Sequence, residues 1–416
     1  MDPLPPAAST TIGDVDALMA QLRAIVDDPK EFASARAIDD AKRQQLRQLT
    51  RAASVALEEP FETVQRLVYS PLPLITTRIA QQHKIFATLA AGSQQGPVSF
   101  EALGEATGLR AAVLESVVDY LGTQGMLSEP VRGQYAATGL THLMLAPLFQ
   151  DAITHFHDNC LPGFGALNAV LATPPSAEKL NAFKVGQHSA VDFYTWLETH
   201  PVQQGAFHRF MEAQFASLPT WLDAVDFAGE MGTAAVAAAN SLSSPEHVAF
   251  VDVGGGNGQQ IAALKERFPE LPGRVVLQDR PEVLEKALEV EGMEKMGYDY
   301  LTEQPVKNAG VYYFRQIMHN NDDDTCIRIL QSQLPAMGAD SLVIIDDKCL
   351  SDDKPPQGAP GVEYTAGLSI AMEVMFNAQE RREAHWRALL PRAGLVIKDI
   401  RRFTKFEDAV IIATKQ

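Results

Sequence analysis

The spacing of apolar and polar positions changes along the chain and divides it into two regions of different character. Between residues 15 and 56, apolar residues recur at helical spacing with charged residues between them. This pattern predicts amphipathic helices whose apolar face needs a partner surface, either in the same domain or on another subunit. From residue 249 onward, short β-branched apolar runs alternate with helical patterns. Such alternation predicts a parallel sheet with helices on both faces.

The C-terminal region yields a definite order of elements. Strands are expected at residues 249–253, 274–278, 310–315 and 341–346, and helices at 258–268, 281–290, 324–336 and 379–390. Residues 395–403 and 408–414 are joined by a short turn, which predicts an antiparallel pair at the sheet edge. The predicted fold class is therefore α/β, a mostly parallel sheet with an antiparallel edge, preceded by a mainly helical region. Ligands bind such sheets at the carboxyl ends of the strands.

Residues 74–143 show three helical segments followed by a short hairpin, which is the order of a winged-helix domain. A winged helix can bind DNA or serve as a dimerisation scaffold. Its third helix, residues 110–121, carries one arginine against a glutamate and an aspartate, whereas a helix in the major groove is rich in Arg, Lys, Asn and Gln. We therefore interpret this segment as a dimerisation domain.

Residues 146–245 read as helices interrupted by prolines, with many aromatic and methionine side chains. Side chains of this kind are typical of a plain core, although some of them can also close over an apolar ligand. His155 and His157 flank Phe156, and either histidine is placed to reach such a pocket or to be purely structural. The expected domains are residues 1–70, 71–145, 146–245 and 246–416.

Composition limits the class of protein. A chain of 416 residues is too long for one typical domain. The net charge of −17 repels phosphate backbones, so nucleic acid is not expected as a partner. No apolar run approaches the length of about 18 to 20 residues that spans a membrane, and the N-terminus is not signal-like. Three scattered cysteines give neither a disulfide framework nor a metal cluster, so we expect a cytosolic protein and no metal.

The most informative stretch is the strand that ends in Asp252-Val253-Gly254-Gly255-Gly256-Asn257-Gly258, directly before a helical pattern. Glycines there permit positive φ and let a ligand lie against bare backbone at the start of a helix. The next strand ends in Asp279, 23 residues after Gly256, where a carboxylate can accept hydrogen bonds from ribose hydroxyls. A dinucleotide site needs a small residue at position 259, which is Gln259. The predicted ligand therefore carries a ribose but is not a dinucleotide.

A candidate catalytic group follows the later strands. His319 comes after the strand at 310–315, an acidic pair that includes Asp347 comes at the end of the strand at 341–346, and Glu380 precedes a helix. Because the carboxyl ends of parallel strands meet at one edge, these side chains are expected in one cleft. A histidine with two acids is what proton abstraction from a hydroxyl requires.

Several segments together resemble a known family. They are FVDVGGGNG, QDRP, YDYLTEQPV, YYFRQIMHNNDDDTCIRIL, VIIDDKCL, FNAQERRE and, nearer the start, DFYTWLETHPVQQGAFHRFM. This set is similar to the S-adenosylmethionine-dependent O-methyltransferases of the plant caffeic acid and fungal secondary-metabolite type, and the resemblance extends from about residue 70. It implies a Rossmann-like class I methyltransferase sheet, a winged-helix dimerisation domain, a homodimer with swapped N-terminal helices and S-adenosylmethionine as the cofactor.

The resemblance also implies roles for individual cofactor-binding residues. Gly254, Gly256 and Gly258 pass under the methionine and ribose portions of the cofactor, and Asp279 holds the ribose hydroxyls. The further positions that it implies are Asp299 at the adenine amino group and Arg315 beside the methionine moiety.

Catalytic and acceptor-binding roles follow in the same way. His319 matches the general base, and Asp347 and Glu380 match the two acids that hold its imidazole, although the first acid is usually Glu. Met372 and Met375 fall in the segment that clamps an apolar acceptor in the family, and we expect Phe156, His157 and Met211 to line the same pocket.

Two departures keep a second reaction open. The family usually has His-Asp-Trp or His-Asn-Trp at the base, whereas this chain has Asn321 at the third position, and Asp347 is shorter than Glu. Fungal proteins that resemble this family act as pericyclases or dehydratases on polyketide products, and in such a role His157, His319 or Lys348 hydrogen-bonds a carbonyl. The retained histidine and acids favour methyl transfer to a hydroxyl of an aromatic or polyketide-derived molecule. A winged-helix regulator with a vestigial ligand domain is disfavoured by the charge of the chain.

Overall fold

The computed structural model describes residues 15–36, 38–92, 96–173, 180–214, 218–227, 247–353 and 361–416. The described residues form two compact units, one that runs to Val68 and one that starts at Tyr69. The expected division of the chain into four domains stays a prediction. In the part that is described, no helix has the length and apolar character needed to cross a membrane.

The first unit consists of helices only. They are α1 (Val15–Asp27), α2 (Pro29–Ala35), α3 (Asp40–Ala56) and α4 (Pro60–Val68). Aspartates begin two of them: Asp28 accepts the backbone N–H of Glu31 at 2.9 Å, and Asp39 accepts that of Lys42 at 2.8 Å. None of the described side chains of α1, α3 or α4 is buried, so the apolar faces that the sequence predicts are exposed in the single chain.

The second unit starts with the expected helices and hairpin. Its elements are α5 (Leu72–Gln82), α6 (Ile85–Gly92), β1 (Val98–Ser99), α7 (Phe100–Thr107), α8 (Ala111–Thr123), β2 (Leu127–Val131) and β3 (Gln134–Ala137). The strands form an antiparallel sheet in the order β1-β3-β2. The first of the three expected helical segments is two helices, α5 and α6, because the chain turns at Lys84, whose φ of 62° is left-handed. Four helices followed by the β2–β3 hairpin agree with the predicted order of helices and then a wing.

A helical region follows. It contains α9 (Gly139–Met144), α10 (Pro147–Thr154), the π-helical turn η1 (His155–Cys160), α11 (Leu161–Leu171), α12 (Ala182–Gly186), α13 (Phe193–Glu198), α14 (Pro201–Ala213) and α15 (Trp221–Ala224). Proline lies in the first turn of α10, α11 and α14, where its missing N–H costs no helical hydrogen bond. The prolines of this region therefore begin helices as well as separating them.

The C-terminal part contains the predicted sheet. Its strands are β4 (Val248–Val253), β5 (Arg274–Asp279), β6 (Met293–Gly297), β7 (Val311–Arg315), β8 (Leu342–Leu350), β9 (Arg381–Arg382), β10 (Leu395–Arg402) and β11 (Asp408–Lys415). The order is β10-β11-β8-β7-β4-β5-β6, and β9 pairs with the end of β8. Pairs from β8 to β6 are parallel, whereas β10 and β11 are antiparallel. The predicted fold class is confirmed.

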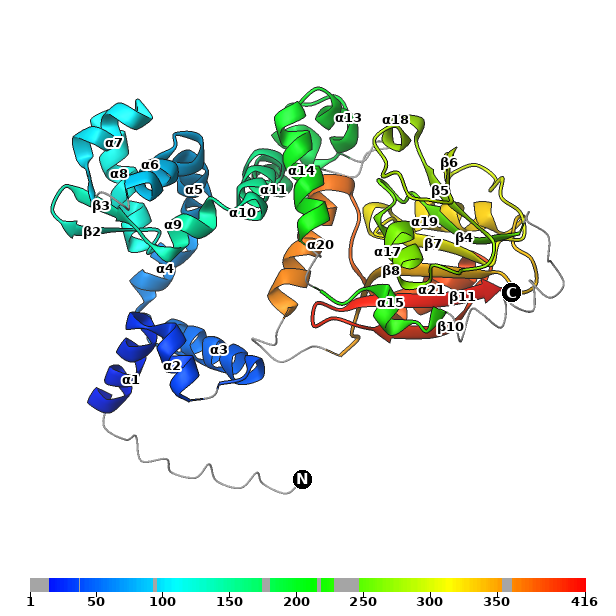
Figure 1. Cartoon of the computed structure of the whole chain (residues 1–416), viewed down its shortest axis with the longest axis horizontal. Coiled ribbons are helices and arrows are strands. Elements are labelled where there is room, and N and C mark those ends of the chain that lie inside the picture. Colours follow the sequence, from blue (N-terminus) through cyan, green and yellow to red (C-terminus); the bar gives the residue numbers. More distant parts are fainter. Residues whose placement is uncertain are drawn as a thin grey trace, which may run out of the picture. The chain divides into compact units, whose positions relative to one another are not determined.

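Helices cover both faces of this sheet (Figure 1). One face packs against α19 (Asp323–Gln333) and α21 (Glu383–Arg392). The other face packs against α15, α17 (Gln259–Arg267) and α18 (Pro281–Leu284). The predicted helix over 281–290 ends early, because the chain turns and the Leu288 N–H donates to the Asn257 carbonyl at 2.9 Å.

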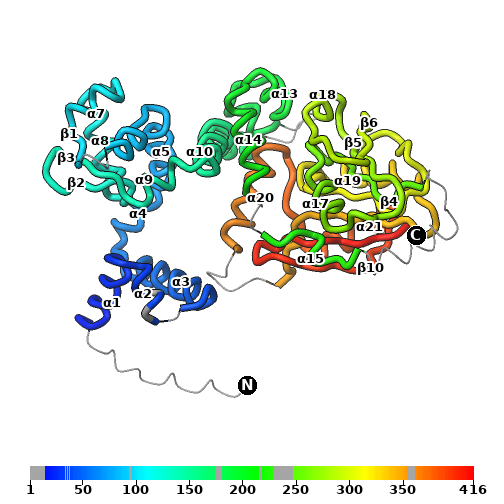
Figure 2. The backbone as a smooth tube through the Cα atoms, viewed as in Figure 1, coloured from blue at the N-terminus to red at the C-terminus, as the bar shows by residue number. Residues whose placement is uncertain are grey.

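One long helix returns from the sheet to the helical region. Helix α20 (Val362–Phe376), which was not among the predicted helices, packs against α11 and α12, far from it in sequence. The trace in Figure 2 shows α20 in orange and the earlier helical region in green. The sequence also placed Asp347 at the end of a strand that stops at residue 346, which is wrong. Strand β8 continues to Leu350, because β11 and β9 pair with it beyond the end of β7.

Candidate active site

The glycine-rich turn lies between β4 and α17, as expected. Gly254, Gly256 and Gly258 have φ values of 69°, 59° and 84°, which side chains with a Cβ rarely adopt. A Cβ on Gly255 would lie 2.4 Å from the Asp252 carboxyl carbon, so this position needs glycine for space. A Cβ on Gly256 would meet nothing within 4 Å, so the turn faces open space there. The turn has room for a ligand against its backbone.

Asp279 ends β5 beside this turn. One of its carboxylate oxygens accepts the Gly256 N–H at 2.8 Å, and the other accepts the Arg280 N–H at 2.7 Å. Burial raises the pKa of Asp279, and these two backbone hydrogen bonds act in the opposite direction. The carboxylate is thus fixed at the edge of the open turn, where the sequence predicted a ribose partner.

The other two predicted cofactor residues have different surroundings. Asp299 is exposed, and its carboxylate accepts the Leu301 N–H at 2.9 Å in the turn after β6. Arg315 ends β7, and its Nη1 lies 3.2 Å from an Asp346 carboxylate oxygen. Burial opposes a charge on Arg315, but Asp346, Tyr313 and Asp408 together outweigh burial and raise the pKa of the guanidinium. Arg315 therefore stays positively charged at the carboxyl end of the sheet.

Asp252 is a buried acid that the sequence analysis did not assign to the site. The residue is 0% exposed, and neither carboxylate oxygen has a hydrogen-bond partner in the described part of the chain. Burial raises the pKa of Asp252 to about 7, although the positive charge of Arg315 opposes this shift. The signal that could have identified it is an acidic residue inside an otherwise apolar strand directly before the glycines.

The three predicted catalytic side chains lie together. His319 is in the 3₁₀ turn η3 (Met318–Asn320), and its Nδ1 lies 2.9 Å from a Glu380 carboxylate oxygen and 3.9 Å from an Asp347 oxygen. The other Asp347 oxygen accepts the backbone N–H groups of Met318 and His319 at 3.1 and 3.3 Å. With Nδ1–H donating to Glu380, the lone pair of the ring is on Nε2.

The surroundings of His319 favour a strong base. Burial lowers the pKa of the imidazole, but the negative charges of Glu380 and Asp347 outweigh burial and raise it above its ordinary value. Burial also raises the pKa of Asp347, to about 7, and His319 opposes that shift. One oxygen of each acid, Asp347 Oδ1 and Glu380 Oε2, has no hydrogen-bond partner among the described residues.

A buried arginine, also missed by the sequence analysis, holds the turn that carries His319. The Arg381 guanidinium donates to the Met318 carbonyl at 2.8 Å and to the Asn321 carbonyl at 2.7 Å. Its Nε donates to the Asp323 carboxylate at 3.0 Å. Arg381 directly follows Glu380, so one short segment supplies both the partner of the imidazole and the clamp on its backbone.

Part of the predicted acceptor pocket comes together around α20. This helix packs against both η1 and η3 and carries Met372 and Met375, which are 8% and 4% exposed. Phe156 packs against the same apolar cluster as Met375. Met211 lies on α14 outside that cluster, and its sulfur accepts a hydrogen bond from Gln214. The structure thus brings Phe156 and Met375 together but does not place Met211 with them.

The histidines of η1 have partners of their own. His157 Nδ1 lies 2.7 Å from Asp158, and the same carboxylate accepts two hydrogen bonds from Arg78 at 3.0 and 2.8 Å. His155 is buried among aromatic rings with Nδ1 2.9 Å from the Asn159 amide. Burial lowers the pKa of His155 to about 4, so this imidazole is neutral.

Lys348 lies on the other face of the sheet from Asp347, because successive residues of a strand point to opposite faces. Its Nζ lies 2.5 Å from an Asp408 carboxylate oxygen, and the side chain is 2% exposed. Lys348 is therefore occupied by a buried ion pair rather than directed toward His319.

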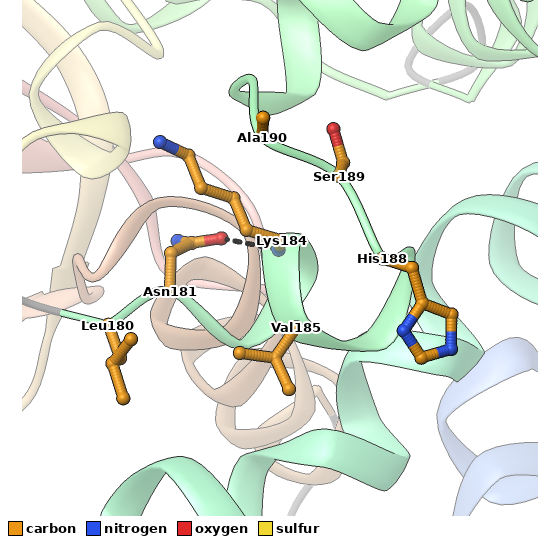
Figure 3. Close-up of a pocket in the computed structure, with 7 residues that line it drawn as sticks. All are labelled: Leu180, Asn181, Lys184, Val185, His188, Ser189 and Ala190. Carbon is orange, nitrogen blue, oxygen red and sulfur yellow. Dashed lines mark hydrogen bonds between the residues drawn. The ribbon is translucent and has the colours of Figure 1, made fainter.

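A surface hollow of about 470 Å³ lies around α12 (Figure 3). Its lining residues are Leu180, Asn181, Lys184, Val185, His188, Ser189 and Ala190. None of the predicted site residues lines this hollow, so it is not the candidate active site.

Comparison with known proteins assigns the family. The sequence pattern of the O-methyltransferase domain matches residues 231–396. The 16-O-methyltransferase bsc6 of Alternaria brassicicola is 32% identical over 361 residues, which cover 86% of this chain and 87% of that protein. The O-methyltransferase lepI of Aspergillus flavus is 28% identical over 377 residues, covering 89% and 93%.

Solved structures agree in fold. The structure of LepI complex with SAM has a TM-score of 0.78 and 26% identity, and the match covers 97% of this chain and 100% of that one. A structure described as a pericyclic reaction enzyme matches with the same score, identity and coverage. The mitomycin 7-O-methyltransferase MmcR has a TM-score of 0.69 at 23% identity, over 88% and 100% of the chains, and shows the fold alone. With the identity to bsc6 over most of both chains, the chain belongs to the S-adenosylmethionine-dependent O-methyltransferases.

Proposed function

We propose that this enzyme transfers the methyl group of S-adenosylmethionine to a hydroxyl of an aromatic or polyketide-derived metabolite, with His319 as the general base. The observation that carries the proposal is the orientation of His319. Its Nδ1 is held by Glu380 at 2.9 Å, which leaves the lone pair of Nε2 for the acceptor hydroxyl.

The chain fits the cofactor at the glycine turn. The backbone at Gly256 faces open space, Asp279 is fixed at its edge, and Asp252 keeps two buried oxygens without partners in the described chain. We assign the ribose to Asp279, the adenine amino group to Asp299 and the methionine moiety to the neighbourhood of Arg315. Gly254, Gly256 and Gly258 then lie under the cofactor.

His319, Glu380 and Asp347 can remove the proton from the acceptor hydroxyl. When bound, the cofactor supplies a methyl group on a positively charged sulfur, which is already activated for transfer. His319 Nε2 accepts the proton of the acceptor hydroxyl, and Glu380 and Asp347 stabilise the imidazolium that forms. A phenol has a pKa of about 10 and an imidazole about 6.5, so the upward shift that the two acids cause narrows the gap. Met372, Met375 and Phe156 exclude water and orient the ring of the acceptor.

The second candidate is a pericyclic or dehydration reaction with methyl transfer absent. It is favoured by one observation, the similarity to the solved pericyclic reaction enzyme at 26% identity. In this reaction His157 or Lys348 would hydrogen-bond a carbonyl of the substrate. Both side chains are already engaged, because His157 is bound to Asp158 and Lys348 is paired with Asp408. The arrangement of His319 between two acids supports proton removal instead.

The test uses S-adenosylmethionine with a labelled methyl group and a panel of phenolic and polyketide-like acceptors. We expect label in the product and an equal amount of S-adenosylhomocysteine. An acceptor that is converted at unchanged mass, or with loss of water, while the cofactor stays intact would establish the second candidate and overturn the first.

We also propose that the enzyme is a homodimer through the helices of its first unit. The support is their exposed apolar surface, in which Val26, Leu57 and Phe61 are 80%, 81% and 71% exposed. Light scattering at micromolar concentration should give twice the mass of the chain, and Phe61→Glu should shift it toward the monomer. Leu171→Glu, at a position 67% exposed on α11, is the matched control and should stay dimeric. A monomeric unaltered enzyme would contradict this proposal.

A cytosolic location belongs to the same proposal. Cys160, Cys326 and Cys349 are all free and buried, which suits a reducing compartment. Fractionation of the producing cells should recover the enzyme with cytosolic markers, and recovery with an organelle would refute this part.

A further inference from the structure

Helix α13 contacts both ends of the proposed reaction site, although no residue of this helix was among the predicted site residues. The Asn320 amide, next to His319 in the chain, donates to the Tyr194 hydroxyl at 3.2 Å. Glu198, at the other end of this six-residue helix, lies 3.8 Å from Arg280, which directly follows Asp279. The helix therefore reaches the residue after the proposed base and the residue after the proposed ribose partner.

The ring of Tyr194 is held by other aromatic rings. It stacks on Phe376 with ring centroids 5.6 Å apart and planes at 24°. Phe193 and Phe207 pack against it with centroids at 5.3 and 6.2 Å. Phe376 is the last residue of α20 and comes four positions before Glu380. Tyr194 is nonetheless 36% exposed, so part of its surface is free to meet a ligand.

The chemistry of the reaction requires a positive charge in this part of the site. The sulfur of the cofactor is linked to the ribose and must stand in line with the acceptor oxygen, so it lies between Asp279 and the base. Burial raises the pKa of the Tyr194 phenol, and the negative charge of Asp279 acts in the same direction. The phenol is therefore neutral at physiological pH, and the electron-rich face of a neutral phenol ring attracts a cation.

We propose that Tyr194 forms an aromatic wall of the methyl-transfer site and contacts the positively charged sulfur of the cofactor. The hydrogen bond with Asn320 and the stack on Phe376 fix the ring, and α13 covers the space between the two ligands. This inference rests on the proposed function, because it uses the positions assigned there to Asp279 and His319.

A contact between Tyr194 and the sulfur predicts a difference between the affinities for S-adenosylmethionine and S-adenosylhomocysteine. S-adenosylmethionine carries the positive charge and S-adenosylhomocysteine does not, so a ring that contacts the sulfur favours the substrate over the product. Replacement of the ring in Tyr194→Leu should weaken binding of S-adenosylmethionine by about tenfold, within the range of a cation–π contact, and of S-adenosylhomocysteine by about twofold or less.

Isothermal titration calorimetry with each compound, in the absence of any acceptor, measures this ratio on the full chain. Tyr194→Phe keeps the ring and should keep the ratio of the unaltered enzyme. Glu198→Gln is the control on the same helix, since it weakens the contact of α13 with Arg280 and leaves the ring in place. A thermal melt of each variant checks that it is folded.

The outcomes distinguish the contact of Tyr194 with the sulfur from the assignment of the cofactor site. A loss confined to S-adenosylmethionine in Tyr194→Leu supports the aromatic wall. Equal losses for both compounds in that variant, or the same selective loss in Glu198→Gln, would show that Tyr194 only docks the helix and would overturn the proposal. If the unaltered enzyme bound neither compound, the cofactor assignment itself would fail, which is a distinct result.

Discussion

Glu380→Gln tests the role of the charge beside His319 with little change in shape. Glutamine keeps an oxygen at the position of the carboxylate, so the Nδ1–H of the imidazole keeps a partner at about the observed 2.9 Å. What is lost is a negative charge. Burial lowers the pKa of His319 and the charge of Glu380 is the largest influence that raises it, so the variant must have a lower His319 pKa.

The distance gives the size of the effect. Two unit charges 2.9 Å apart attract with about 6 kcal/mol at an effective dielectric constant of about 20. If a quarter of this remains after desolvation, the pKa of His319 falls by about one unit, since one unit is about 1.4 kcal/mol. A weaker base removes the acceptor proton more slowly, so we expect kcat to fall about tenfold.

The sign of the pH effect follows from the same shift. The base works only when Nε2 is unprotonated, so the rate falls as the pH drops through the pKa of His319. In Glu380→Gln the acid limb of the kcat profile should move about one unit lower while the plateau falls. Steady-state rates with labelled S-adenosylmethionine at a series of pH values measure both.

Glu383→Gln is the control for Glu380→Gln. It removes a carboxylate on α21 that pairs with Arg387 of the same helix and with Arg402 of β10, and it should leave the profile unchanged. Affinity for the cofactor should stay within about twofold in both variants. An acid limb that stays in place or moves to higher pH in Glu380→Gln would show that His319 is not the titrating base.

Two further predictions concern the base, the cofactor and the buried acid under the glycine turn. His319→Ala should abolish turnover and leave cofactor affinity within about tenfold, whereas Asp279→Ala should mainly lower cofactor affinity. Calorimetry together with rate measurements separates the two effects. Loss of cofactor binding in His319→Ala would make that residue structural. Asp252→Asn should stabilise the ligand-free enzyme at pH 8: the pKa of Asp252, about 7 in the fold, lies above its usual value, so ionisation costs stability progressively from about pH 4 to 7 and fully above. The cost is of order 2–4 kcal/mol, enough to raise the Tm by several degrees, and thermal melts at pH 5 and 8 should show a larger gain at pH 8 than at pH 5. An equal change at both pH values would contradict a charged, buried Asp252.

Local patterns were sufficient for the elements around the cofactor. A short β-branched apolar run and the following glycines located β4 and its turn, and Asp279 followed from the end of the next apolar run. Other elements had no such signal. Strand β6, Met-Glu-Lys-Met-Gly, has no β-branched residue and forms by pairing with β5. Helix α20 is apolar without one polar face, because the sheet region and the helical region both pack against it.

The sequence by itself determined which residue types stand at the strand ends, since the motifs that carry them are contiguous in the chain. It therefore pointed to His319, Glu380 and Asp347 as a group. Their division of labour was decided by the tertiary structure. Glu380 lies 61 residues from His319 in sequence and binds its ring, whereas Asp347 mainly holds the backbone of the turn.

The contributions of Arg381 and Tyr194 also depend on the tertiary structure. Tyr194 lies 126 residues before Asn320, and Arg381 lies 63 residues after Met318. Contacts between such distant positions depend on how α13, α20 and the end of β8 pack, and no local periodicity encodes that packing. The physical reason is that a motif records the needs of one turn or strand, while an active site is completed by every element that folding brings to the same edge of the sheet.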